Sequence, residues 1–362
     1  QTTRGALVPR IFRGFTDMSR LLSDSSTILL IAASLSACSS DDKKNEGTND
    51  AAVPVADANG TTGDSFTVTW GPHDVAGGEE NTQCMIARLD NAGQIRVGEI
   101  VNSLGTASHH FIVYRIAEGE VSSAPYECQP FADTLNPADG APLMVTQRAE
   151  EVLTLPEGVA FTFAPNQLIR LELHYLNTSD QTQTVTATST FVPMPEADFQ
   201  HEADFLFLGN PDITLPPGEV TTLGPSVLPL PVDLVGSKIF GITGHTHQWG
   251  TDVKVELGTD AGYNMLYDVP NYNWDEHETT RLEPAVEVPT GGAFRFSCEW
   301  NNLSGAEVGF GEGADDEMCF FWAYYYPSKG ARVCLHSDQY PDVVTDLCCP
   351  GHDLCGLILG NL

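Results

Sequence analysis

Two histidines one residue apart are the first feature of this sequence that could do chemistry. They are His245 and His247, in the stretch GHTHQWG from Gly244 to Gly250, directly after the apolar run KIFGIT. In a β-strand, residues two apart project from the same face, with Cα atoms about 7 Å apart. The two imidazoles could therefore hold one metal ion at roughly 2 Å from a nitrogen of each ring. Two polar side chains on a sheet face would show the same spacing, so the motif alone leaves both interpretations open.

Three further segments carry side chains that can bind metals. His109 and His110 are adjacent at the start of the strand-like segment SHHFIVYRI. Neighbouring strand residues point to opposite faces, so both could bind one ion only at a strand start or an irregular turn. His174 lies in LELHYLN with Glu172 two residues earlier on the same face, and Met318 lies in DDEMCFFWAYYYP. Taken singly, such residues are more often structural than ligands.

Short strands separated by turns must position these residues, because helical periodicity is nearly absent. Runs such as FTVTW (66–70), QLIRLELHYL (167–176) and AFRFSCEW (293–300) alternate apolar and polar residues between clusters of Gly, Pro, Asn and Asp. Many short strands at about ten-residue spacing are typical of sandwiches and jelly rolls. The predicted fold class is all-β, with two tandem antiparallel β-sandwich domains, jelly-roll-like, and a Cys-rich C-terminal tail.

A chain of 362 residues is long enough for two domains of ordinary size. We expect the boundary between them at PMPEAD (193–198), where prolines and acids interrupt the strand pattern. The predicted divisions are an upstream segment with a lipoprotein-type signal (1–38), a disordered acidic tether (39–64), a first sandwich (65–195), a second sandwich (196–328) and the Cys-rich tail (329–362).

The N-terminal region predicts export. The apolar stretch TILLIAASLSA is too short to span a bilayer as a mature helix, and Cys38 follows it. The tetrapeptide LSAC resembles the bacterial lipobox, so we expect an envelope protein whose only membrane attachment is a lipid on Cys38. An ordinary signal peptide cleaved nearby is the alternative. Lys and Arg total 17 against 49 Asp and Glu, and the formal charge of −32 disfavours nucleic acid and anionic membrane surfaces as partners.

The cysteines other than Cys38 favour disulfides, because their number is even and the chain is expected to be exported. Their spacing does not match a zinc ribbon, so structural zinc is not expected. Four lie in the tail: Cys334, Cys348, Cys349 and Cys355. We expect two disulfides there, because the segment has too few apolar residues for a core of its own. The sequence does not reveal how these four pair.

The four candidate segments together resemble a known family. In chain order they read His-His, His-Tyr, His-x-His and Glu-Met-Cys, and four longer stretches agree: IRLELHYLN, IFGITGHTHQWG, FRFSCEWNN and VGFGEGADDEMCFFWAYYYP. This pattern resembles the copper type II ascorbate-dependent monooxygenases, the family of dopamine β-monooxygenase and peptidylglycine α-hydroxylating monooxygenase. It is nearer to the dopamine branch, and it covers about residues 66 to 330.

The resemblance implies two copper ions, each held by three side chains. It assigns an electron-transfer copper to His109, His110 and His174, and an oxygen-binding copper to His245, His247 and Met318. A thioether favours Cu(I), the state that binds dioxygen, whereas imidazole serves either oxidation state. Glu172 is expected to orient a ligand. The disulfides that the resemblance implies are Cys84–Cys128 and Cys298–Cys319.

The activity that the resemblance implies is hydroxylation of a substrate C–H bond with O2, with ascorbate or another one-electron reductant. The peptide branch is expected to hold a carboxylate with basic and polar side chains. The corresponding positions here are Thr243, Phe320 and Trp322, which favours a small, apolar or aromatic, non-peptide substrate. The alternative is a copper-binding or copper-storage protein without a productive pocket. A blue-copper carrier would need Cys319 as a thiolate ligand, and a zinc hydrolase would have no use for Met318.

Overall fold

The structure is a computed structural model that describes residues 65–128, 140–275, 279–311, 313, 315–339 and 346–349. The predicted signal with Cys38, the tether and Cys355 lie outside these residues. All described residues belong to one compact unit within Ala56–Leu362. Within the described residues, no helix has the length and apolar character needed to cross a membrane.

Almost all regular structure is β-strand. The first half of the described chain contains β1 (Phe66–Val75), β2 (Glu80–Arg88), β3 (Ile95–Leu104), β4 (Ser108–Ile116), β5 (Tyr126–Glu127), β6 (Gly140–Thr146), β7 (Glu150–Thr154), β8 (Val159–Phe163), β9 (Leu168–Leu176), β10 (Gln183–Met194) and β11 (His201–Glu202). The second half contains β12 (Asp204–Gly209), β13 (Thr214–Leu215), β14 (Val220–Pro229), β15 (Lys238–His245), β16 (Gly250–Thr259), β17 (Gly262–Asp268), β18 (Thr280–Glu287), β19 (Ala293–Asn301), β20 (Val308–Gly309), β21 (Phe320–Tyr326), β22 (Arg332–His336) and β23 (Asp346–Cys349). The described helices are two short 3-10 turns, η1 (Glu196–Asp198) and η2 (Val232–Leu234). The predicted all-β sandwich class is confirmed.

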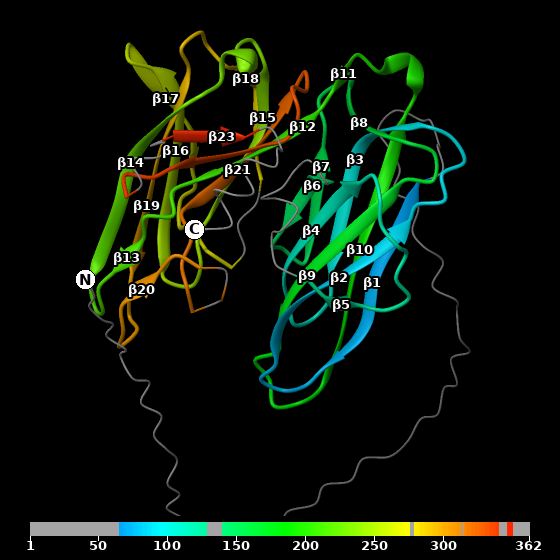
Figure 1. Cartoon of the computed structure of the whole chain (residues 1–362), viewed down its shortest axis with the longest axis horizontal. Helices are drawn as coiled ribbons and strands as arrows, with labels where there is room; N and C mark the ends of the chain where they lie inside the picture. Colours follow the sequence, from blue (N-terminus) through cyan, green and yellow to red (C-terminus); the bar gives the residue numbers. More distant parts are fainter. Residues whose placement is uncertain are drawn as a thin grey trace, which may run out of the picture. The chain divides into compact units, whose positions relative to one another are not determined.

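Two sheets make up the first half (Figure 1). One has the strand order β1-β10-β3-β8-β11, with β7 also paired to β3, and the other has the order β5-β2-β9-β4-β6. The pairing is antiparallel except between β8 and β11. β9, with the sequence LIRLELHYL, lies inside the second of these sheets between β2 and β4, and nearly every side chain along it is buried. It is therefore a central strand with both faces covered.

The second half contains the sheets β18-β15-β21-β12-β22-β23 and β14-β19-β16-β17, with the small pair β13-β20. β22 and β23 come from the segment predicted as a separate tail, and they extend the first of these sheets next to β12. Cys334 therefore lies on β22, and Cys348 and Cys349 lie on β23, within a sheet of the second half. The predicted domain limits at 195 and 328 remain predictions.

β21 is buried on both faces, which explains its almost entirely apolar sequence FFWAYYY. Three alternate residues pack in the core of the second half: Phe321, Ala323 and Tyr325. Phe320, Trp322 and Tyr324 belong to a core that they share with strands of the first half, and the partly buried Tyr326 packs against the same core. One face of the β15–β21 pair is consequently turned toward the first half, and the metal-ligand candidates of this region lie on that side.

Disulfides connect described cysteines in both halves: Cys84–Cys128, Cys298–Cys319 and Cys334–Cys348. Cys298 lies on β19 and Cys319 directly precedes β21, so this bond joins the two large sheets of the second half. Cys334 and Cys348 are directly opposite each other on β22 and β23, a pairing that the sequence left open.

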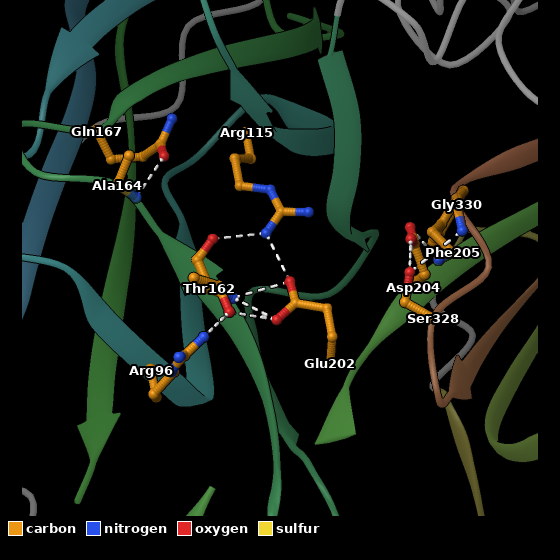
Figure 2. A network of polar contacts seen from close by, with 10 residues as sticks. All are labelled: Arg96, Arg115, Thr162, Ala164, Gln167, Glu202, Asp204, Phe205, Ser328 and Gly330. Atoms are coloured by element: carbon orange, nitrogen blue, oxygen red, sulfur yellow. Dashed lines mark hydrogen bonds and ion pairs between the residues drawn. The ribbon is translucent and has the colours of Figure 1, made fainter. Parts of the chain in front are cut away.

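The chain passes from the first half to the second between β11 and β12, where two carboxylates hold it on either side (Figure 2). Glu202 accepts hydrogen bonds from Nη1 of Arg115 at 2.8 Å and from the backbone N–H of Thr162 at 3.0 Å. Two residues later, the buried Asp204 accepts a hydrogen bond from the hydroxyl of Ser328 at 2.5 Å. The crossover is thereby bonded to the first half at Glu202 and to the second at Asp204.

Candidate metal centres

The three histidines of the first half converge where β4 pairs with β9. His110 is directly opposite His174, and the register of the pair shifts between Ser108 and His110, so that a β-bulge stands at His109. A bulge re-aims side chains, which allows adjacent residues to face the same side. One ring nitrogen of each histidine lies within 4.8 Å of those of the other two. His109 and His110 could bind one ion only at a strand irregularity, and this bulge supplies it.

Burial keeps His110 and His174 neutral, which is the form that binds metals. His110 and His174 are buried, and His109 is partly exposed. Burial, with smaller contributions from the nearby His109 and His247, lowers the pKa of His174 to about 3. Burial also holds the pKa of His110 well below its usual value, with His174, His109, His245 and His247 adding to the effect. Histidines of both groups therefore lie close enough to His110 to lower its pKa.

Two carboxylates approach the first histidine group. Oε1 of Glu80, on β2, lies 3.0 Å from Nε2 of His174. Oδ1 of Asp275, from the second half, lies 3.3 Å from Nδ1 of His109, and the ring of Trp274 lies against the same histidine. A carboxylate that accepts a ring N–H orients the histidine and makes its other nitrogen a stronger ligand. Neither acid was predicted, because nothing in its local sequence indicates a histidine partner far along the chain.

The second histidine group lies at the end of β15. His245 is the last residue of the strand and His247 is in the turn that follows. Both are buried, and their ring centroids are 5.1 Å apart. Nδ1 of His245 lies 3.1 Å from Oε1 of Gln147, and Nδ1 of His247 lies 3.0 Å from the backbone oxygen of Asp316. Burial lowers the pKa of His247 to about 4, so this ring is neutral as well.

Glu317 ties the segment of Met318 to this turn. Its carboxylate has no exposed surface and accepts the backbone N–H groups of His247 at 2.8 Å and Trp249 at 2.7 Å. It also accepts the indole N–H of Trp300 at 2.8 Å. Burial raises the pKa of Glu317 to about 7, against the lowering effect of these hydrogen bonds. Met318 follows directly and is itself buried, so the same bonds hold its backbone next to the histidine turn. Sequence reasoning missed Glu317, although it precedes the predicted methionine ligand.

Glu172, the acid expected to orient a ligand, is buried in β9. It accepts hydrogen bonds from the hydroxyl of Tyr114 at 3.1 Å and from Nη2 of Arg170 at 3.2 Å. Its role toward a metal ligand stays a prediction, whereas Glu80 is the acid placed against His174.

The positions expected to face a substrate lie on the strands of the second histidine group. In the β15–β21 pair, Thr243 is opposite Trp322 and His245 is opposite Phe320. The three substrate-facing candidates are buried, and Oγ1 of Thr243 donates a hydrogen bond to Oγ1 of Thr279 at 2.9 Å. No positive charge stands at any of these three positions.

Both groups of side chains fit copper. The first group offers three imidazoles, and the second offers two imidazoles with a thioether on the adjoining segment. Imidazole and thioether are ligands that copper accepts, and a thioether is out of place at a hard cation such as Mg²⁺ or Ca²⁺.

Comparison with known proteins connects this geometry to a family. Residues 210–344 match the family model described as copper type II ascorbate-dependent monooxygenase, C-terminal domain. Dopamine beta-hydroxylase of Rattus norvegicus is 29% identical over 182 residues, which cover 47% of this chain and 29% of that protein. The putative DBH-like monooxygenase protein 2 of Homo sapiens is 23% identical over 190 residues, or 48% of this chain and 37% of that protein. The chain thus spans about a third of the length of these relatives.

The segment 210–344 thus matches the C-terminal domain of the copper type II ascorbate-dependent monooxygenases, and the relatives named above are similar to about half of the chain. The family predicted from the sequence is therefore confirmed. Among solved structures, the major capsid protein P2 from bacteriophage PM2 covers 72% of this chain and 97% of its own, with 13% identity and a TM-score of 0.33. That score is too low to support any inference about function.

Proposed function

We propose that this chain is a copper-dependent monooxygenase that hydroxylates a C–H bond of a small, non-peptide substrate. Ascorbate or another one-electron reductant supplies two electrons. One atom of O2 then enters the product as its hydroxyl oxygen. The other atom takes up two protons and leaves as water. The observation that carries the proposal is the convergence of His109, His110 and His174. These residues lie outside the segment matched by the family model, so the cluster is separate support for the same activity.

Each group of side chains has a distinct part in the proposal. His109, His110 and His174 would hold one copper ion, and His245, His247 and Met318 would hold the second. Copper in these positions supplies the one-electron chemistry that activates O2. The soft sulfur of Met318 favours the reduced ion. Burial of the ligands limits water, which suppresses side reactions of activated oxygen.

The side chains expected to face the substrate at the second centre favour a small apolar or aromatic molecule. Thr243, Phe320 and Trp322 offer one hydroxyl and two aromatic rings, and none of them carries a charge that could bind a peptide carboxylate. Aromatic side chains pack well against an apolar substrate body.

Metal counting and product analysis test the proposal together. The copper-loaded chain should bind two copper ions and, with ascorbate, convert a member of a panel of small aromatic amines and alcohols to a hydroxylated product seen by mass spectrometry. His174→Ala should abolish product formation while the second centre keeps its copper. Met318→Ile should weaken Cu(I) binding at the second centre by about tenfold or more. The control His201→Ala, on β11, should change neither property.

Other outcomes would contradict the proposal. Two bound copper ions with O2 consumption but no product, or with no consumption, would favour the non-catalytic copper-binding alternative. Normal hydroxylation by both His174→Ala and Met318→Ile would show that the ligand assignments are wrong.

A further inference from the structure

Gln147 belongs to the first half of the chain but contacts a proposed ligand of the second metal centre. It follows β6 directly and is 4% exposed. Its Oε1 lies 3.1 Å from Nδ1 of His245, and 98 positions separate the two residues in the sequence. The contact therefore exists only because the two halves pack against each other.

Neighbouring contacts fix the segment that carries Gln147. The backbone N–H of Val145 donates to the hydroxyl of Tyr324 at 3.4 Å, and Glu151 accepts hydrogen bonds from the backbone and side chain of Thr279 at 3.1 Å and 2.9 Å. Residues 145–151 thus contact the second half on either side of Gln147. The amide is held against His245 by this packing and is not a free surface side chain.

The strand register also brings Gln147 close to the first metal centre. Thr146, the last residue of β6, is opposite Phe111 of β4. Gln147 follows Thr146 and His110 precedes Phe111, so Gln147 comes level with His110 at the next position of the antiparallel pair. The residue consequently stands between a ligand candidate of each centre.

Hydrogen-bond partners decide which ring nitrogen each histidine of the second centre offers. The backbone oxygen of Asp316 can only accept, so Nδ1 of His247 carries the hydrogen and the lone pair of the neutral ring is on Nε2. The amide oxygen of Gln147 is also an acceptor, and it favours the same tautomer of His245. His245 and His247 then both offer Nε2 to a shared ion.

We propose that Gln147 is a positioning residue of the second metal centre, which accepts the Nδ1 hydrogen of His245 and thereby fixes the ring orientation and tautomer that offer Nε2 to copper. This inference rests on the proposed function, because it requires copper at His245, His247 and Met318. It also makes the second centre dependent on the first half, since the acceptor comes from there.

Three variants of the full-length chain test the inference. Gln147→Leu removes the acceptor with little change in side-chain volume, whereas Gln147→Glu keeps an acceptor oxygen at the same place. Gln167→Leu is the matched control: Gln167 is a buried glutamine of the first half whose Nε2 donates to the backbone oxygens of Ile116 and Leu168. Gln147→Ala replaces Gln147→Leu if the latter does not fold.

Two readouts report on the metal centre without relying on turnover. Competition with a chromophoric chelator gives the Cu(I) affinity of the second centre, and Cu(I) is diamagnetic, so ¹⁵N NMR of labelled histidines gives the tautomer of His245. We expect Gln147→Leu to weaken Cu(I) binding at the second centre by about 10- to 100-fold, as loss of a residue that orients a ligand does. The Nδ1–H tautomer of His245 should become a mixture. Gln147→Glu should remain within a few-fold of the native affinity, and Gln167→Leu should leave both readouts unchanged.

Unchanged affinity and an unchanged His245 tautomer in Gln147→Leu would overturn the inference. An equal loss in Gln147→Glu would also overturn it, because packing rather than the acceptor oxygen would then be responsible. A native chain that binds fewer than two copper ions would refute the proposed function, and the inference with it. Two bound copper ions together with an insensitive Gln147→Leu variant would refute the inference alone.

Discussion

Single buried residues outside the ligand motifs hold the ligand candidates in place. Glu317 bonds to the backbone of the histidine turn, Gln147 bonds to the ring of His245, and Glu80 bonds to the ring of His174. Gln147 and Glu80 offer acceptors to ring nitrogens, the arrangement that neutral histidine ligands need if their other nitrogen is to bind a metal, whereas Glu317 fixes the backbone of the turn.

Glu317→Gln should destabilise the protein and weaken the second centre. The amide retains one acceptor oxygen, and its NH₂ group would face the N–H donors of His247, Trp249 or Trp300. Leaving a buried donor without its acceptor costs about 1–3 kcal/mol, so the free energy of unfolding from denaturant titration should fall by this amount. Cu(I) affinity at the second centre should fall with it.

The control for this variant is Glu299→Gln on β19. Glu299 accepts a hydrogen bond from the Thr251 hydroxyl at 3.1 Å and is not part of the buried turn. We expect its free energy of unfolding to stay within about 0.5 kcal/mol of the native value. Equal effects of the two substitutions would argue against a special role for Glu317.

At the level of strands, irregularities and edges decide where ligands point. The bulge at His109 turns adjacent residues of β4 toward one place, and the two-faced burial of β21 directs alternate residues to different cores. The disulfide Cys298–Cys319 then fixes the start of β21, directly after Met318, to β19.

Removal of this disulfide should affect the second centre more than the first. In Cys298→Ala/Cys319→Ala, a cross-link that closes a separation of 21 residues is lost. The unfolded chain gains freedom, and the free energy of unfolding should fall by about 3 kcal/mol. Copper occupancy measured by metal analysis should decrease at the second centre, because the Met318 segment loses its covalent tie. The double variant Cys84→Ala/Cys128→Ala is the control, and it should weaken the first centre instead. Equal copper loss at both centres in either variant would contradict this.

Across the whole molecule, the two centres depend on how the halves are joined. The crossover runs from Glu202, bonded to Arg115 and Thr162, to Asp204, bonded to Ser328. Earlier in the chain, residues 145–151 also contact the second half, at Tyr324, His245 and Thr279. The halves also share an apolar core that contains side chains of both.

Asp204 should make the stability of the protein depend on pH. Burial is the main cause that raises its pKa above the ordinary value of 3.8, against the lowering effect of its hydrogen bond from Ser328. The carboxyl therefore ionises more readily in the unfolded chain, so its contribution to stability is lost as pH rises from about 4. Asp204→Asn cannot ionise, and its free energy of unfolding relative to the native chain should increase over this range.

Urea unfolding at a series of pH values between about 4 and about 8 measures this difference. Ser328→Ala should act in the opposite direction, because loss of the hydrogen bond raises the pKa of Asp204 further and steepens the decline. A difference between Asp204→Asn and the native chain that stays constant over the range would disprove the assignment.

The sequence predicted the strand character and the family because both depend on local patterns. Alternation in runs such as β1 and β19 reflects one buried and one more exposed face, and it is visible without knowing the partner strand. The ligand candidates were recognisable because a short motif carries them, as in the stretch from Gly244 to Gly250. The strands of the predicted tail were not recognised, because their burial depends on pairing with β12.

By itself, the sequence indicated which residues are candidates for copper ligands and that they lie on or next to short strands, since residue chemistry and periodicity are properties of neighbouring positions. Only the tertiary structure decided which acceptors face the histidines: Glu80, Gln147 and Glu317 reach their partners across tens of residues. It also decided that the two histidine groups influence each other. The physical reason is that strand register and the packing of one half on the other bring these groups together, and neither is encoded in local sequence.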